Sequence, residues 1–156
     1  MEEVLLSPEF LEFLKCLNDE KVEYLLIGGY AVNLHGYARA TGDMDVWVAM
    51  KQSNAEAIIR AFDRYGFDID GMDLSIFTNP RSIVRFGDPP MKVEVVTSIE
   101  GVDFDRCKNN ADQFEAAGVL IPVIGLKDLR TNKAASGRPK DLVDLEHLPN
   151  PDQTPD

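Results

Sequence analysis

The chain has 156 residues, a length that predicts one domain built around one hydrophobic core. Its composition, 44% hydrophobic and 28% charged, excludes collagen-like, mucin-like and fully disordered classes of protein. The 16 basic and 27 acidic side chains give a formal net charge of −11. That charge disfavours a general nucleic-acid coat protein, unless the basic side chains gather in one place.

The cysteines and the apolar segments predict the compartment. Cys16 and Cys107 lie far apart and outside any Cys-x-x-Cys or Cys/His pattern, so we expect buried, reduced thiols and no zinc site. The first residues lack the basic start and the apolar run of a signal peptide. No segment approaches the ~20 apolar residues that a membrane span needs. We therefore expect a cytoplasmic protein without a membrane partner.

The first part of the chain predicts helices that alternate with strands. Ser7 and Pro8 are typical of a helix start, and apolar residues then recur at helical spacing up to about Asp19. The elements expected next are a strand over 22–27 ended by Gly28-Gly29, a brief helix over 30–35, a strand over 44–50, and a helix capped by Ser53 and ended by Gly66.

Short strands are expected in the middle of the chain and helices near its end. The predicted strands cover 74–77, 83–86, 92–97 and one or two segments of 114–124, and the predicted helices cover 103–109, 126–135 and 140–148. Short connections favour antiparallel pairing. We therefore expect one α/β (α+β) domain over 1–148, with a mixed, mostly antiparallel sheet flanked by helices. Residues 149–156 are expected to be a disordered, acidic, proline-rich tail.

Asp43 and Asp45 are candidate metal ligands at the start of a predicted strand. Because residues two apart in a strand point to the same face, their carboxylates are expected to converge. Two carboxylates on one rigid face suit a pair of Mg²⁺ ions, since hard cations prefer oxygen ligands. Taken alone, such a pair is more often two exposed aspartates at a strand end.

Two neighbouring features strengthen this hypothesis. Gly28-Gly29 follows a strand and opens a helix, so its backbone N–H groups are able to approach phosphate, although an ordinary turn explains it as well. Glu94 lies in the middle of an apolar strand, where an unpaired charge calls for a partner or a metal. The alternative is an edge-strand glutamate that faces solvent beside Lys92.

Basic side chains are needed to offset the negative charge of a triphosphate, and few regions of this acidic chain supply them. Arg39, Lys133, Arg138 and Lys140 are the candidates. Alternatively, Arg39 holds Asp43 in place, and Arg138 or Lys140 pairs with Asp141 or Asp144 on a solvated helix face. For His35 we expect a structural role at a helix end. Trp47 is in phase with Asp45, and sheet packing is its expected role.

The combined pattern of strand, Gly28-Gly29, and Asp43-Met44-Asp45 on the next strand resembles the DNA polymerase beta-like nucleotidyltransferase superfamily. The resemblance implies the nucleotidyltransferase fold and transfer of a nucleoside monophosphate from an NTP. It also implies that Asp43, Asp45 and Glu94 bind two Mg²⁺ (or Mn²⁺) ions, and that Glu94 helps to deprotonate an acceptor hydroxyl. Nucleotide contacts are implied for Gly28, Gly29, Arg39, Thr41, Lys133 and Arg138.

The segments 39–45, 125–129 and 137–145 are similar to a minimal bacterial branch, the AbiEii-like enzymes of abortive-infection and toxin–antitoxin operons. This similarity implies a possible operon-encoded partner protein and an acceptor that is RNA (tRNA among the candidates), a protein or a small molecule. Many members have serine where Gly29 stands and aspartate where Glu94 stands. The alternative function is a non-catalytic nucleotide sensor or antitoxin-like partner that keeps the fold.

Overall fold

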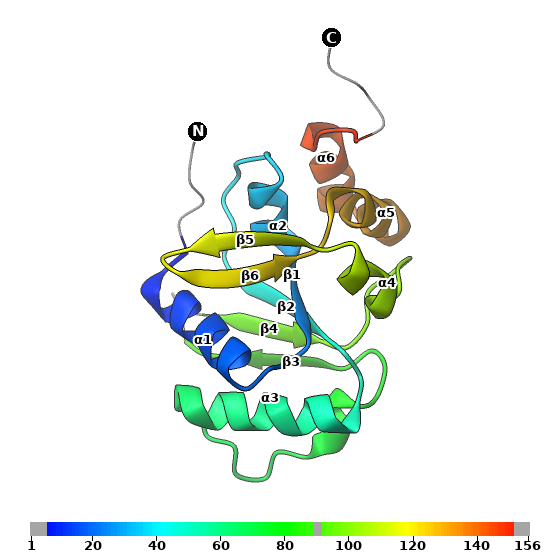
Figure 1. The fold of residues 1–156 in the computed structure, drawn as a ribbon. Helices are drawn as coiled ribbons and strands as arrows, with labels where there is room; N and C mark the ends of the chain where they lie inside the picture. The colour runs from blue at the N-terminus through cyan, green and yellow to red at the C-terminus, as the bar shows by residue number, and fades with distance from the viewer. Residues whose placement is uncertain (1–5, 89–91, 152–156) are drawn as a thin grey trace.

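The computed structural model describes residues 6–88 and 92–151, which form a six-stranded sheet with helices around it (Figure 1). The strands lie in the order β3-β4-β2-β1-β6-β5. Their bounds are β1 Tyr24–Ile27, β2 Met44–Val48, β3 Ile83–Phe86, β4 Val93–Val96, β5 Asp112–Ala116 and β6 Val119–Val123. The helices are α1 Pro8–Asp19, α2 Gly28–Leu34, α3 Gln52–Tyr65, α4 Phe104–Asn109, α5 Leu126–Ser136 and α6 Pro139–His147, with a 3-10 turn η1 at Leu74–Phe77.

The sheet is mixed, as the alternating pattern of the chain predicts. β1 pairs antiparallel with β2 and parallel with β6, and β2 pairs parallel with β4. The two edge strands, β3 and β5, are each antiparallel to their neighbour. Antiparallel pairs therefore predominate, and the expected fold class is confirmed. All four residues of β1 are buried, because this strand lies inside the sheet and helices cover it.

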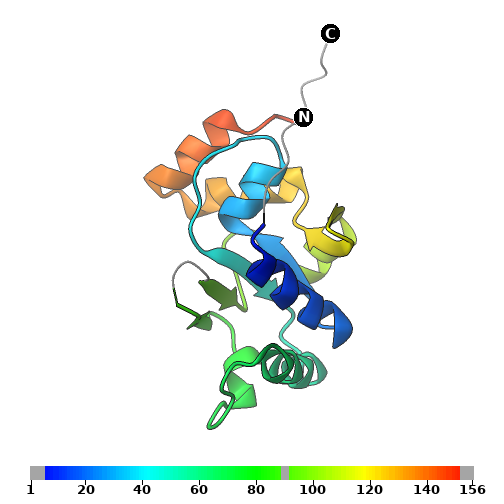
Figure 2. The ribbon, with the colours of Figure 1, turned by 90° about the vertical axis from the view of Figure 1, so that its left-hand side faces the viewer.

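The helices gather at two places around the sheet. In both views α2, α5 and α6 lie together at one end of the molecule, while α3 lies at the opposite end (Figures 1 and 2). Ser7 caps α1 by accepting a hydrogen bond from the backbone of Phe10, as predicted. The fully buried Phe62 of α3 stacks on Phe13 of α1 and contacts Phe86 of β3. These aromatic contacts join α1 and α3 to the core, and Phe10 of α1 also packs edge-to-face on Tyr30 of α2.

Two predicted details are wrong. Residues Leu74–Phe77 form a 3-10 turn rather than a strand, because the Asp73 carboxylate caps it by accepting from the backbone of Ser75 and Phe77 turns inward against Phe62. The N-cap of α3 is Lys51, which makes no side-chain capping bond, rather than Ser53.

Other expectations are confirmed within the described residues. Cys16 and Cys107 are buried, free thiols. In the part of the chain that the structure describes, no helix is both long and apolar enough to cross a membrane. Most of the tail predicted to be disordered, residues 152–156, lies outside the described residues.

Candidate active site

The two predicted acids on strands lie next to each other in the sheet register. Asp45 of β2 is opposite Glu94 of β4, and Glu94 is opposite Arg85 of β3. On its other side Asp45 is opposite Ile27, the last residue of β1. Residues directly opposite in neighbouring strands share one face of a sheet. Glu94 and Asp45 therefore lie side by side on one face, in what we call the carboxylate row. Arg85 lies beyond Glu94 at one end of this row, and the Gly28-Gly29 turn lies at the other.

Gly28 and Gly29 are required by the close approach of other side chains. Gly28 has a φ of +69°, and a Cβ built on it would overlap the Oδ2 atom of Asp45. A Cβ on Gly29 would likewise overlap the hydroxyl of Thr41. The glycine pair thus admits Asp45 and Thr41 against the start of α2. This explains the Gly-Gly motif by site packing, and its predicted contact with phosphate stays a prediction.

Asp45 is the most perturbed acid of the carboxylate row. Burial, followed by the nearby charges of Glu94 and Asp43, raises its pKa to about 6 from an ordinary value of 3.8. Lys140 and Lys133 oppose that rise. The positive charges around Asp45 therefore do not compensate for its burial and its acidic neighbours, and a bound cation would relieve the repulsion.

The other two acids are more accessible. Asp43 is exposed and stands at the bend before β2. Burial, followed by the charge of Asp43, raises the pKa of Tyr30. Glu94 is partly buried, with 23% of its side chain exposed, and it accepts a 2.9 Å hydrogen bond from Nε of Arg85. Glu94 is not on an edge strand, because β3 lies outside β4. The solvent-facing alternative beside Lys92 is therefore replaced by an ion pair with Arg85.

The donor chemistry of these three acids fits a divalent cation. All three offer carboxylate oxygens, the ligands that Mg²⁺ prefers, and Asp45 carries the raised pKa of an acid without its counter-charge. Within residues 6–88 and 92–151, no three His, Cys, Asp or Glu side chains already stand together as a metal cluster. The structure thus brings Asp45 and Glu94 side by side and Asp43 near them, without arranging them as a finished metal site.

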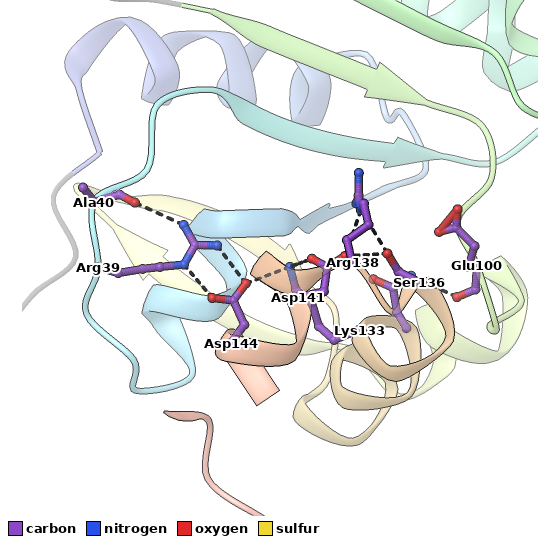
Figure 3. A network of polar contacts seen from close by, with 9 residues as sticks. Arg39, Ala40, Glu100, Lys133, Ser136, Arg138, Asp141 and Asp144 are labelled. Carbon is purple, nitrogen blue, oxygen red and sulfur yellow. Dashed lines mark hydrogen bonds and ion pairs between the residues drawn. The ribbon is translucent and has the colours of Figure 1, made fainter. Parts of the chain in front are cut away.

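A buried ion network joins α5 to α6 (Figure 3), and the charge of its Lys133 acts on Asp45. The Lys133 ammonium is 2.9 Å from Asp141 Oδ1 and 3.0 Å from Asp144 Oδ2, and all three residues are almost fully buried. Asp141 also accepts hydrogen bonds from Ser136 and Arg138. Lys133 was predicted to contact phosphate; in this structure its charge is taken up by the two aspartates.

The network also holds the loop that leads to Asp43. Arg39 binds Asp144 through two parallel hydrogen bonds, Nε to Oδ1 at 2.7 Å and Nη2 to Oδ2 at 2.9 Å. Two residues earlier in the loop, Tyr37 stacks on His147 of α6 with ring centres 4.3 Å apart. Arg39 was expected to contact phosphate or to hold Asp43 directly. In the structure Arg39 anchors the loop to α6 through Asp144, and its contact with phosphate stays a prediction.

The network's carboxylates are stabilised in their ionised form. Burial disfavours ionisation of Asp141, but hydrogen bonds from Ser136, Lys133 and Arg138 outweigh it and hold the pKa at about 2. The same balance, with Arg39 and Lys133 as donors, lowers the pKa of Asp144. These aspartates therefore serve as fixed counter-charges for the basic side chains.

Positive charge reaches the carboxylate row from the junction between α5 and α6. Lys140 and Lys133 partly offset the rise in the pKa of Asp45. The pKa of Arg138 is raised mainly by Asp141, and Asp45 adds a smaller effect in the same direction. Arg138 pairs with Asp141, as the alternative interpretation expected, but 77% of its side chain is exposed. Arg138 and Lys140 are thus exposed basic groups at this junction whose charges act on Asp45.

The remaining predicted residues have structural surroundings. The ring of His35 is 2.7 Å from the backbone oxygen of Ile124, in keeping with the helix-end role expected for it. Trp47 is buried, and its indole N–H donates to the backbone oxygen of Thr97, as sheet packing requires. Sequence reasoning missed Arg85. The sequence indicates that Arg85 lies on a strand, but it does not indicate that this residue is opposite Glu94 in the sheet.

A mixed sheet that places paired acids beside a Gly-Gly turn defines a nucleotidyltransferase-like protein. Residues 7–151 match the family described as nucleotidyl transferase of unknown function (DUF2204), and the chain belongs to that family. Its fold is similar to the crystal structure of a candidate nucleotidyltransferase from Thermotoga maritima, with a TM-score of 0.61 and 19% identity, covering 91% of this chain and 93% of that one. A comparison with curated proteins gives no significant match.

Removing one carboxylate of the buried network should destabilise the protein. For Asp144→Asn we expect a loss of about 3 kcal/mol in the free energy of unfolding at pH 7, because Arg39 and Lys133 lose a shared counter-charge. Glu146→Gln, an exposed carboxylate of α6, is the matched control and should change little. Chemical denaturation measures both, and equal effects of the two variants would contradict the role of the network.

The same network makes the stability of the fold depend on pH in the acid range. The lowered pKa values of Asp141 and Asp144 contribute stability that is complete above about pH 4 and is lost as the pH falls toward about 2. The stability difference between wild type and Asp144→Asn should therefore shrink between about pH 4 and pH 2.

Asp45→Asn should act in the opposite direction. Its carboxyl ionises near 3.8 in the unfolded chain and at about 6 in the folded one, so its ionisation begins to reduce stability near pH 4 and does so in full above about pH 6. We expect the variant to be more stable by about 1–3 kcal/mol at pH 7.5 in chelator, with the gain vanishing by about pH 4. Asp63→Asn, an exposed residue on α3, is the control. An Asp45→Asn protein that is less stable at pH 7.5 would contradict this electrostatic account.

Proposed function

We propose that this protein transfers a nucleoside monophosphate from an NTP to a hydroxyl group, in a reaction that depends on Mg²⁺ or Mn²⁺. The observation that carries the proposal is the position of Asp45. It lies against Gly28, in register with Glu94, and within electrostatic reach of the exposed basic side chains of Lys140 and Arg138. Membership of a nucleotidyl transferase family supports the same reaction class.

The carboxylate row and the basic junction have complementary roles in this proposal. Asp43, Asp45 and Glu94 would hold the divalent ions, which polarise the attacking and leaving oxygens when they are bound. Arg138 and Lys140 would contact the phosphates on the opposite side, where charge-assisted hydrogen bonds are strong. A polyanionic substrate then fits between two layers of opposite charge, with the cation neutralising the acidic layer.

The reaction needs one proton acceptor and one leaving group. The acceptor hydroxyl forms a bond to the α-phosphorus of the NTP as the bond from that phosphorus to the pyrophosphate oxygen breaks. We assign the hydroxyl proton to the Glu94 carboxylate, which is partly exposed and reachable from solvent. Pyrophosphate leaves with the negative charge, on the side where Arg138 and Lys140 lie.

Four residues predicted to bind nucleotide have structural contacts and position the site in this proposal. Arg39 and Lys133 are occupied by Asp144 and the buried network, so we assign them the task of holding the loop and the α5–α6 junction. Thr41 and Gly29 are in close contact with each other, so Thr41 shapes the glycine turn. A direct phosphate contact from any of the four stays a prediction.

The acceptor, the operon context and the compartment are proposed from the sequence. Similarity of segments 39–45 and 137–145 to AbiEii-like enzymes supports a role in toxin–antitoxin or phage-defence systems, with RNA, a protein or a small molecule as acceptor and an operon-encoded partner. Two buried, free thiols fit a reducing cytoplasm.

One observation favours the alternative function, a non-catalytic nucleotide sensor or antitoxin-like partner. Glu94 is engaged by Arg85, and the three acids are not arranged as a finished metal cluster in the described residues. A protein that binds nucleotide without turnover needs no such cluster. The two functions differ in whether label is transferred.

Asp45→Asn should abolish transfer while leaving the fold intact. Wild type and variant are incubated with α-labelled NTPs, Mg²⁺ and a cell lysate, and the label bound to macromolecules and to small molecules is measured. We expect at least a hundredfold loss, because the variant removes one negative charge from the cation site. Asp63→Asn controls for the loss of any aspartate and should transfer like wild type.

Two outcomes would contradict the proposal. Transfer by wild type that persists in Asp45→Asn would overturn the assignment of the carboxylate row. Absence of transfer from every NTP, with nucleotide still bound, would favour the sensor function.

A further inference from the structure

Arg85 is a charged neighbour of the carboxylate row for which the proposed reaction has no role. It lies on the edge strand β3, directly opposite Glu94, and its Nε atom donates to Glu94 Oε2 at 2.9 Å. Glu94 in turn is opposite Asp45 on the inner side. The acid therefore stands between a guanidinium on one side and a second carboxylate on the other.

The Arg85–Glu94 pair differs from the buried pairs of the network. Arg39 and Asp144 expose 17% and 1% of their side chains, whereas Arg85 and Glu94 expose 72% and 23%. Exposed ion pairs are weak because water screens the charges and the long side chain loses entropy on pairing. Breaking the Arg85 pair therefore costs little, while breaking the Arg39 pair would strand a buried carboxylate.

The geometry makes Arg85 and a divalent cation competitors. Glu94 has one carboxylate group to offer, and the residue opposite it on the inner strand is a second acid, Asp45. A cation bound between these two acids needs oxygen atoms of Glu94, one of which now accepts from Arg85. An exposed side chain on an edge strand is free to turn toward solvent when the cation takes its place.

We propose that Arg85 is a positioning residue that holds Glu94 by an ion pair in the cation-free protein and is displaced when a divalent cation binds between Glu94 and Asp45. This inference rests on the proposed function, because it takes Glu94 as a cation ligand. It adds that the cation site contains its own internal competitor. The affinity for the cation is then set partly by a residue that does not bind it.

Titration with Mn²⁺ alone tests the inference without any turnover. Arg85→Gln removes the competitor and should bind Mn²⁺ about five- to tenfold more tightly than wild type, by calorimetry or by the electron paramagnetic resonance signal of free Mn²⁺. Arg85→Lys keeps the charge and should stay within about twofold of wild type. Lys92→Gln removes an equal charge from an exposed residue just before β4 and is the matched control, expected within about twofold.

The outcomes separate this inference from the proposed function. One outcome is that wild type binds Mn²⁺, Asp45→Asn does not, and Arg85→Gln and Lys92→Gln tighten binding equally. Arg85 would then act only through the net charge of the surface, and the inference would be overturned. If Arg85→Gln binds as wild type does, it is also overturned. If wild type binds no Mn²⁺ and Arg85→Gln binds none either, the proposed cation site itself fails.

Discussion

The burial of one ammonium group between two aspartates determines how the site is assembled. Lys133 of α5 bridges Asp141 and Asp144 of α6, and Asp144 also binds Arg39 of the loop that leads to Asp43. Each charge in this network has a partner of opposite sign, so the network is stable only when both helices and the loop are in place. The position of the loop relative to α6 therefore follows from a buried charge balance.

The carboxylate row shows the opposite principle. Asp45 and Glu94 are adjacent with too little positive charge around them, and the pKa of Asp45 rises to about 6 as a result of burial and of its acidic neighbours. A protein bears such a cost where function requires the charges to be close. Arg39 and Lys133 are paired with aspartates of the network, so their charges are not free to compensate Asp45. Arg138 and Lys140 stay exposed, and we expect an added cation to supply the missing positive charge at Asp45.

Local signals in the sequence predicted most of the fold and the acids of the site. Alternation placed Asp45 on a strand, and an acid inside an apolar run identified Glu94, because both signals depend on residues close in sequence. Leu74–Phe77 was wrongly predicted as a strand, since its apolar residues resemble one while Asp73 caps a turn. The Arg39–Asp144 pair spans 105 positions, and such partners depend on the folded geometry and on no local pattern.

A crystal structure of the full chain with Mn²⁺ and a non-hydrolysable NTP analogue tests the central claim most directly. The account predicts anomalous density for Mn²⁺ in contact with Asp45 and with at least one of Asp43 and Glu94, and phosphates that extend toward Arg138 and Lys140. A triphosphate bound elsewhere, or bound by basic side chains with no Mn²⁺ at Asp45, would contradict it.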